Sequence, residues 1–486
     1  MRGYLNRVIK KRPLIIGFFL SAFFLGCNRT VEVPEPISSV TSDQVFSSDA
    51  TATSAMLGIY YNMLVNRAFS NLETTFYAGE SADELTDQTS GTEYQDIFLS
   101  NTLTSLGASS TSLQNFWQPA YFYIYSANAV ISGIESSTGM TSATKSQLRG
   151  EAEFIRAFCY FYLTNLFGEV PIVLSTDFNQ TVLLAKSSQA KIYQQIVSDL
   201  LDGQNSMLSD FSLSGGQPIR ANKWAATALL ARVYLYQQNW ASADSAASAV
   251  IKSGQFSLVP LPQIQADYTF PDSDAFEANT PEAILQLQSQ SNVYPYATWE
   301  GNFFIPYYSF FVPSAWLTTQ LLSAFEPDDL RRINWVDSNV NNGVTYYYPY
   351  KYKVNVGPGS IAENYTMLRF SEQYLIRAEA EANLSQLGPA INDLNTIRSR
   401  AGLDSLPASL SQSQVLSAIQ QENRIEFFAE WGHRWFDLKR WGIAIQTMDT
   451  ISYKRSIDST QLLYPIPLIE IQNDPNLTQN PGYLSH

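Results

Sequence analysis

The stretch from Glu422 to Gly442 combines acidic, basic and aromatic residues closely enough to raise the question of catalysis. Its sequence is ENRIEFFAEWGHRWFDLKRWG, with four acids and four bases among its rings. His433 could act as a general base beside Glu430 or Asp437, but no nucleophile or metal ligand lies at a matching spacing. We therefore favour a structural role, in which ion pairs and the stacking of arginines on aromatic rings satisfy the charges.

Three acids of this stretch have helical spacing. Glu422, Glu426 and Glu430 occur at i, i+4 and i+8, which places them on one face of a helix. Glycine is a common terminator of helices, so we expect this helix to end at Gly432. The charged side chains and the rings are then predicted to share one small volume.

The sequence contains none of the familiar catalytic or metal-binding motifs. Only His433 and His486 are present, which excludes zinc sites of the histidine-rich kind, and no HExxH or paired CxxC motif occurs. GxSxG and the phosphate-binding GxxxxGK[ST] are absent as well. Two SxxK matches, Ser142–Lys145 and Ser188–Lys191, lack a companion KTG motif and are expected by chance in a serine-rich chain.

Acidic residues between positions 256 and 360 leave two further chemistries open. Two facing carboxylates suffice for glycoside hydrolysis, although their separation is not readable from sequence. Asp272 and Asp274 could equally ligate calcium, but no complete calcium-binding loop surrounds them. The acids considered for a hydrolytic pair are Asp272, Asp274, Glu277, Glu282, Glu300, Asp328 and Asp329.

Composition limits the class of protein. The chain has 486 residues, of which 45% are hydrophobic and 13% aromatic, so it can bury a large core and still expose some of its rings. Exposed rings favour a binder of ligands with flat apolar faces, such as sugars. The formal net charge is -14, and it becomes -19 without the first 26 residues, which carry five bases and no acid. A surface this acidic argues against nucleic acid as a partner.

The N-terminus has the form of an export signal. A basic start is followed by an apolar run, Leu14 to Leu25, that is too short to span a bilayer. Phe24-Leu25-Gly26-Cys27 is similar to a lipobox, in which Cys27 would be acylated and anchor the chain to a membrane. The alternative is a plain secretory signal. Cys159, the other cysteine, lies in an apolar helical pattern, so a disulfide between the two is not expected.

The elements that would position a site are mostly helices. Leu113–Ile134 and Glu151–Phe167 have helical periodicity, and we expect the second to be buried on most sides and to end at Gly168. Two segments, Lys223–Ile251 and Arg377–Ile397, have the small-residue spacing of tetratricopeptide helix pairs, although generic alanine-rich hairpins would look similar. The small residues that allow close helix approach are Ala231, Ala243, Ala378 and Ala390.

The segment 256–360 differs in character. It is rich in Pro, Gly, Asn and aromatic residues, has little helical period, and includes SNVYPYATWEGNFFIPYYSFFVPSAW. A long irregular segment inside a large domain is often functional, so we interpret it as an insertion that faces a ligand.

Four stretches resemble the SusD/RagB family of outer-membrane lipoproteins, and they follow one another along the chain in the same order as in that family. They are Glu422–Gly442, Glu151–Val173, Leu368–Leu403 and Tyr464–Tyr483. The resemblance implies a mostly α fold, with a tetratricopeptide-like helical-repeat scaffold and an irregular aromatic-rich layer. The expected parts are a lipoprotein signal peptide (1–26), lipidated Cys27 with a tether (27–40), an N-terminal helical part (41–255), the insertion (256–360) and a C-terminal part (361–486).

The resemblance also implies a function without catalysis. Members capture oligosaccharides at the outer surface of the outer membrane and pass them to a SusC-like TonB-dependent transporter, and no cofactor is implied. The alternatives are a RagB-like peptide binder and a surface α-helical glycoside hydrolase. The family places its ligand site in the early loop and the middle insertion, which nominates Trp299, Tyr296, Tyr294 and Tyr94 for stacking and Asn302, Asp87, Gln88 and Asn101 for hydrogen bonding.

Overall fold

The computed structural model describes residues 41–88, 97–104, 108–263, 274–355 and 362–484. The chain divides into two units, Met1–Ser42 and Asp43–His486, and nearly all described residues belong to the second. The predicted signal peptide, Cys27 and its tether, together with Tyr94 and Asp272, lie outside the described residues. Within the described part, no helix combines the length and apolar character needed to cross a membrane.

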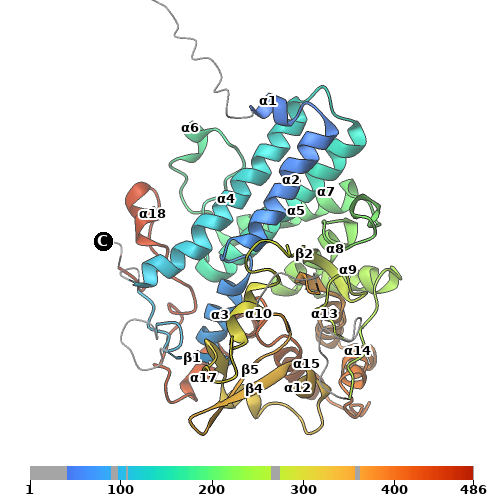
Figure 1. Cartoon of the computed structure of the whole chain (residues 1–486), viewed down its shortest axis with the longest axis vertical. Helices are drawn as coiled ribbons and strands as arrows, with labels where there is room; N and C mark the ends of the chain where they lie inside the picture. Colours follow the sequence, from blue (N-terminus) through green and yellow to red (C-terminus); the bar gives the residue numbers. More distant parts are fainter. Residues whose placement is uncertain (1–40, 89–96, 105–107, 264–273, 356–361, 485–486) are drawn as a thin grey trace, which may run out of the picture. The chain divides into compact units, whose positions relative to one another are not determined.

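Long helices build the N-terminal part, and α2, α4 and α5 pack against one another (Figure 1). Helix α5 begins after Thr141, whose hydroxyl caps the Thr144 N–H, and ends at Gly168 with φ of 78°. Its residues from Gly150 to Leu163 are all buried, as predicted. The helices are α1 (Ser42–Val45), α2 (Asp49–Val65), α3 (Leu72–Ser81), α4 (Ala108–Ser136), α5 (Ser142–Phe167), α6 (Phe178–Thr181), α7 (Gln189–Ser206), α8 (Lys223–Tyr236) and α9 (Trp240–Lys252), with a 3₁₀ turn at Ser212–Ser214.

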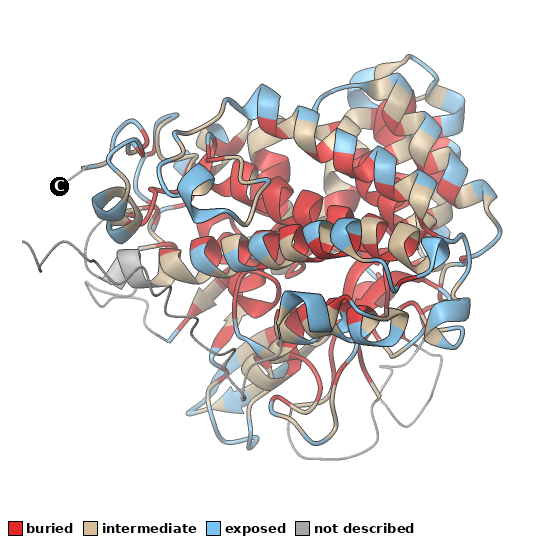
Figure 2. Ribbon diagram, turned by 90° about the horizontal axis from the view of Figure 1, so that it is seen from above, coloured by how far each residue is buried: buried red, intermediate tan, exposed pale blue. Residues whose placement is uncertain are grey.

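Two helix pairs confirm the tetratricopeptide-like spacing. Helix α8 packs on α9, α9 packs on α13 (Phe370–Asn383), and α13 packs on α14 (Leu387–Arg400). The four alanines predicted to permit close approach, Ala231, Ala243, Ala378 and Ala390, are completely buried. Figure 2 shows the buried residues along the inner sides of the packed helices and the exposed ones outside. The mostly α prediction is therefore confirmed.

Short elements build the middle of the chain. Among the described residues the strands form three antiparallel two-stranded sheets, in the pairs β1–β3, β2–β6 and β4–β5. Long loops join them. The elements are β1 (Leu85–Asp87), β2 (Ala283–Leu287), α10 (Trp299–Phe304), β3 (Ala315–Leu317), α11 (Thr319–Leu322), α12 (Leu330–Asn334), β4 (Val336–Asn341), β5 (Val344–Pro349) and β6 (Tyr365–Arg369).

The C-terminal helices bring the Glu422–Gly442 stretch against both halves of the chain. Helix α15 (Gln412–Glu426) packs on α13 and α14, and α16 (His433–Arg440) packs on α3. The prediction that the helix with Glu422 and Glu426 continues to Gly432 is wrong, because this helix, α15, ends at Glu426 and an irregular turn follows. Ala429, Trp431 and Gly432 have left-handed backbone in this turn. The last helices are α17 (Ala444–Asp449) and α18 (Leu468–Asn473).

The three glutamates nevertheless meet in one buried cluster of charges. Glu426 binds Arg331, Arg369 and Arg400, which come from α12, the end of β6 and the end of α14. Glu422 binds Arg331, and Glu430 binds Arg369 at 2.9 Å. Burial alone would raise the pKa of the Glu426 carboxyl, but the three guanidiniums hold it well below its usual range.

The neighbours of His433 support the structural interpretation of this residue. The imidazole stacks on the Phe427 ring at 4.7 Å, and burial together with nearby arginines lowers its pKa well below the usual value. Both acids considered as its partners are bound elsewhere. Glu430 accepts from Arg369, and Asp437 accepts from Arg440 at 2.7 Å.

Replacing Gly432 by alanine should destabilise the fold more than the same change at Gly442. Both glycines have left-handed backbone, with φ of 70° and 72°, which costs other residues about 1–2 kcal/mol. A Cβ at position 432 would also lie 2.7 Å from the Ala78 Cβ, whereas space around position 442 is open. We expect Gly432→Ala to lose about 1–3 kcal/mol more unfolding free energy than Gly442→Ala. Equal losses in urea denaturation would contradict the close packing of the turn on α3.

Candidate ligand-binding surface

Three of the nominated rings meet at the start of α10. The Thr298 hydroxyl caps this helix by accepting from the Gly301 N–H at 3.1 Å, and Trp299 is the first helical residue. The Tyr294 ring contacts the Trp299 ring edge to face at 5.1 Å and the Tyr296 ring at 5.9 Å. A short loop therefore presents three rings, with the Tyr294 ring nearly perpendicular to the other two.

The rings differ in what they offer to a ligand. Trp299 is half-buried, and its indole N–H donates to the Leu64 carbonyl at 2.9 Å, which fixes the ring. Tyr294 is 50% exposed, and its hydroxyl donates to the Asn302 amide oxygen. Asn302 in turn donates to the Asn355 carbonyl at 2.7 Å. The exposed Tyr294 ring is thus held from both sides before any ligand arrives.

The polar residues nominated from the early loop are placed differently. Asp87 is buried in β1, and Asn101 is buried in a turn with φ of 56°, so neither side chain is presented to a ligand. Gln88 is exposed, but its amide donates to the carbonyls of Val312 and Pro313, both at 3.0 Å. These hydrogen bonds from Gln88 connect the loop after α10 to the end of β1.

That loop carries exposed rings that the sequence analysis did not single out. Tyr307, Tyr308, Phe310 and Phe311 are 48–62% exposed, and the rings of Tyr308 and Phe310 lie parallel at 5.2 Å. Asn355 donates to the Pro306 carbonyl at 3.1 Å, which links this loop to the Tyr294–Asn302 contact. The run YYSFF between two prolines was the available signal, because consecutive aromatic residues cannot all face a core.

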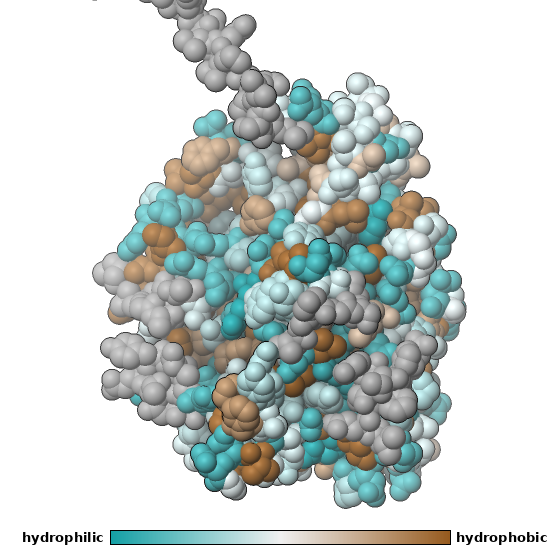
Figure 3. All heavy atoms as spheres, in the orientation of Figure 1, coloured by the Kyte–Doolittle hydropathy of each residue, from teal (hydrophilic) through white to brown (hydrophobic). Residues whose placement is uncertain are grey.

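On the face seen in Figure 3, hydrophobic residues reach the surface in separate patches rather than as one continuous area. Small separate patches are normal on protein surfaces, so a candidate site has to be identified from the contacts of particular rings. We refer to Tyr294, Tyr296, Trp299 and Asn302 together with Tyr307–Phe311 as the aromatic surface.

Three of the acids considered for hydrolysis bind cations. Asp274 binds Lys353 at 2.6 Å, Asp329 binds Arg331 at 2.8 Å, and Glu282 binds two arginines of the buried cluster. Over the described residues, no group of three or more histidine, cysteine, aspartate or glutamate side chains could hold a metal ion. Asp274 therefore gives no support to a calcium site with Asp272.

Glu300 is the acid next to Trp299, and it faces inward. It is buried, and the Thr75 hydroxyl donates to it at 3.3 Å. Burial raises the pKa of its carboxyl to about 7, above the value of 4.5 expected in an unfolded chain. The side chain is thus directed into the protein, away from a ligand on the exposed ring.

Changing Glu300 to glutamine should alter how stability depends on pH. Between about pH 4.5 and 7 the folded wild type holds a proton that the unfolded chain has lost, so its stability falls as pH rises through this window. Glutamine has no proton to lose. As pH rises, we expect the free energy of unfolding of the variant to increase relative to that of the wild type, by up to about 3 kcal/mol above pH 7. Urea titrations at several pH values that give a constant difference would contradict the raised pKa.

Comparison with known proteins places the chain in a family. A sequence model of the SusD family matches residues 288–483, and one described as "Starch-binding associating with outer membrane" matches residues 38–235. SusD-like protein P25 of Formosa agariphila is 23% identical, with 98% of this chain and 100% of that protein covered. The starch-binding protein SusD of Bacteroides thetaiotaomicron is 25% identical, over 72% and 75% of the two chains. The chain belongs to the SusD/RagB family.

Solved structures agree on the fold. A SusD superfamily protein of Parabacteroides distasonis superposes with a TM-score of 0.74 at 23% identity, covering 92% of this chain and all of that one. Surface glycan-binding protein A of Bacteroides thetaiotaomicron, solved in complex with laminarihexaose, gives a TM-score of 0.73 at 19% identity, with 89% and 99% covered. The scaffold is therefore the SusD fold.

Proposed function

We propose that this protein captures an oligosaccharide on the aromatic surface without changing it chemically. The main support is the exposed Tyr294 ring, which contacts Trp299 and donates a hydrogen bond to Asn302. Asn355 connects Asn302 to the loop that carries the other exposed rings. Sugar rings have apolar C–H faces that pack on aromatic rings, while their hydroxyls need fixed polar partners. Family members named for starch or glycan binding support the same class of ligand.

The surroundings of the aromatic surface favour binding over hydrolysis. A glycosidase needs two carboxyl groups facing each other across the sugar. Glu300 points inward, and Asp274, Glu282 and Asp329 neutralise buried cations. These contacts support a role for the four acids in the interior of the protein rather than in cleavage of a bound sugar.

The proposed role extends to delivery. We infer that the protein is an acylated lipoprotein, anchored through Cys27 at the outer surface of the outer membrane. A SusC-like TonB-dependent transporter would receive the captured glycan, with the lipoprotein closing over its barrel as a hinged lid. The resemblance of the four quoted stretches and the outer-membrane description of one family model support this part.

A binding screen on the exported body, from Asn28 onward, tests the proposal. The panel holds neutral oligosaccharides of several linkages and, in parallel, peptides of similar length, and each binder is analysed for products after incubation. We expect saturable binding of at least one glycan that is recovered intact. Binding of peptides alone would favour the RagB-like alternative, and shortened glycans would favour the hydrolase.

A further inference from the structure

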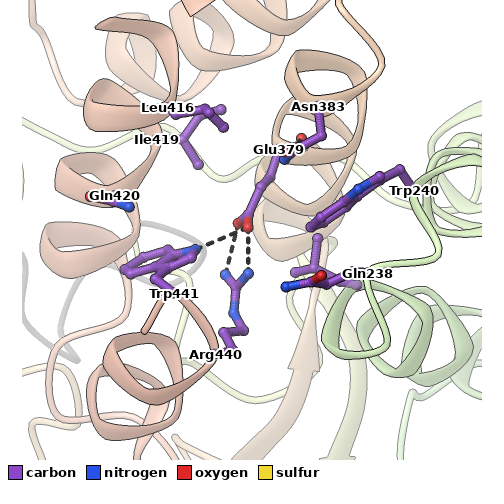
Figure 4. A pocket seen from close by; sticks show the side chains of 10 residues that line it. Gln238, Trp240, Glu379, Asn383, Leu416, Ile419, Gln420, Arg440 and Trp441 are labelled. Atoms are coloured by element: carbon purple, nitrogen blue, oxygen red, sulfur yellow. Dashed lines mark hydrogen bonds and ion pairs between the residues drawn. The ribbon is translucent and has the colours of Figure 1, made fainter. Parts of the chain in front are cut away.

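A cavity of about 180 Å³ lies away from the aromatic surface, where the turn between α8 and α9 meets α13, α15 and the end of α16 (Figure 4). All its lining residues belong to the helical scaffold. Trp240 and Trp441 lie on opposite sides of it, with Glu379 and Arg440 between them. The other lining side chains are Leu235, Gln238, Asn383, Leu416, Ile419 and Gln420.

One wall of this scaffold cavity is rigidly built. The buried Glu379 carboxylate accepts two bonds from the Arg440 guanidinium and a third from the Trp441 indole N–H at 2.9 Å. The same guanidinium lies 4.6 Å from the centre of the Trp441 ring. The indole is therefore fixed by both its edge and its face, as a preorganised stacking partner should be.

The rest of the lining offers polar groups that the protein does not use. Over the described residues, the amides of Gln238 and Gln420 and the Trp240 indole N–H have no hydrogen-bond partner, and Asn383 uses only its amide nitrogen, on the Glu379 carbonyl. Figure 4 shows Gln238 on the side of Trp240 and Gln420 on the side of Trp441. These groups can both donate to and accept from a ligand.

Charge selects the class of ligand. Arg440 is neutralised by Glu379 and Asp437, so the cavity offers no free positive charge to a phosphate or carboxylate. Half-buried indoles beside free amides suit a neutral molecule with apolar faces and a rim of hydroxyls. The small volume suits one ring rather than a chain.

We propose that the scaffold cavity is a second binding site, which takes a single neutral pyranose ring in the space that Trp240 and Trp441 line. It is separate from the capture proposed at the aromatic surface and does not depend on it. The site would hold a terminal or branch sugar, with the ring stacked on an indole and its hydroxyls bonded to Gln238 and Gln420.

The test uses fluorine NMR on the body from Asn28 onward, labelled with 5-fluorotryptophan. The resonances of Trp240 and Trp441 are assigned from Trp→Phe variants. The probes are the methyl pyranosides of glucose, galactose, mannose and N-acetylglucosamine, with a neutral N-acetyl tripeptide amide as the competing ligand class. We expect at least one pyranoside to shift both resonances saturably.

Variants test whether the pyranoside binds in the scaffold cavity. In Trp240→Ala the shift at Trp441 should vanish, and Gln420→Ala should weaken binding about ten-fold. Trp224→Ala, a tryptophan at the start of α8 outside the cavity, should leave the affinity unchanged. No saturable shift with any of the four pyranosides would overturn the proposal, as would binding of the tripeptide amide alone or an unchanged Trp441 shift in Trp240→Ala.

Discussion

Replacing Glu426 by glutamine should lower the free energy of unfolding by about 3–5 kcal/mol. The carboxylate is completely buried and binds three guanidiniums that come from different segments of the chain. Glutamine keeps the volume but removes the negative charge, which leaves Arg331, Arg369 and Arg400 with less anionic charge than they need. Urea denaturation followed by circular dichroism measures the loss.

The exposed ion pair of Glu135 with Arg149 provides the matched control. Exposed pairs contribute little, so Glu135→Gln should lose at most about 1 kcal/mol. The charge of Glu426 also predicts a pH dependence. Its pKa is lowered by folding, so the stability it contributes is present above its unfolded pKa and is lost as the solution is acidified. Equal losses for the two variants would contradict the view that the buried cluster holds α12, β6, α14 and α15 together.

Removing the rings of the aromatic surface should abolish glycan capture. Tyr294→Ala deletes the exposed ring and should cost about 2–3 kcal/mol, which is roughly 30- to 150-fold in Kd. Trp299→Ala deletes the ring that supports Tyr294 and frees the Leu64 carbonyl. The double variant is expected to bind no glycan measurably. Calorimetry with the glycan found in the screen gives these values.

A control separates loss of binding from loss of folding. Phe178 on α6 is 70% exposed and lies in a different part of the chain, so Phe178→Ala should leave both the affinity and the melting temperature unchanged. Trp299→Ala should lower the melting temperature only slightly. If the Tyr294 and Trp299 variants bind as tightly as the wild type while remaining folded, the aromatic surface is not the capture site.

The helical part of the fold was predictable because its signals are local. Gly168 ends α5, and the alanines twelve residues apart in α8–α9 and α13–α14 set how closely the helices pack. The end of α15 was not predictable from periodicity. Glu430 keeps the helical spacing in sequence, but Arg369, distant along the chain, binds it in a turn instead. A pattern within one segment does not reveal its distant partners.

The candidate site was predictable only where its residues are neighbours in sequence. Tyr294, Tyr296, Trp299 and Asn302 lie within nine positions and meet in space. Asp87 and Asn101 were nominated because of their position in the early loop. Both are buried, so they are not available to a ligand as Tyr294 is. Residue type alone does not distinguish a buried amide in a turn from one that awaits a ligand.

A crystal structure of the exported body with the best-binding oligosaccharide from the screen tests the central claim most directly. The account predicts a sugar ring packed on Tyr294, with its neighbours along the aromatic surface and all glycosidic bonds intact. An additional sugar in the scaffold cavity would agree with this result. An oligosaccharide bound only away from the aromatic surface, or one shortened in the crystal, would contradict non-catalytic capture at this site.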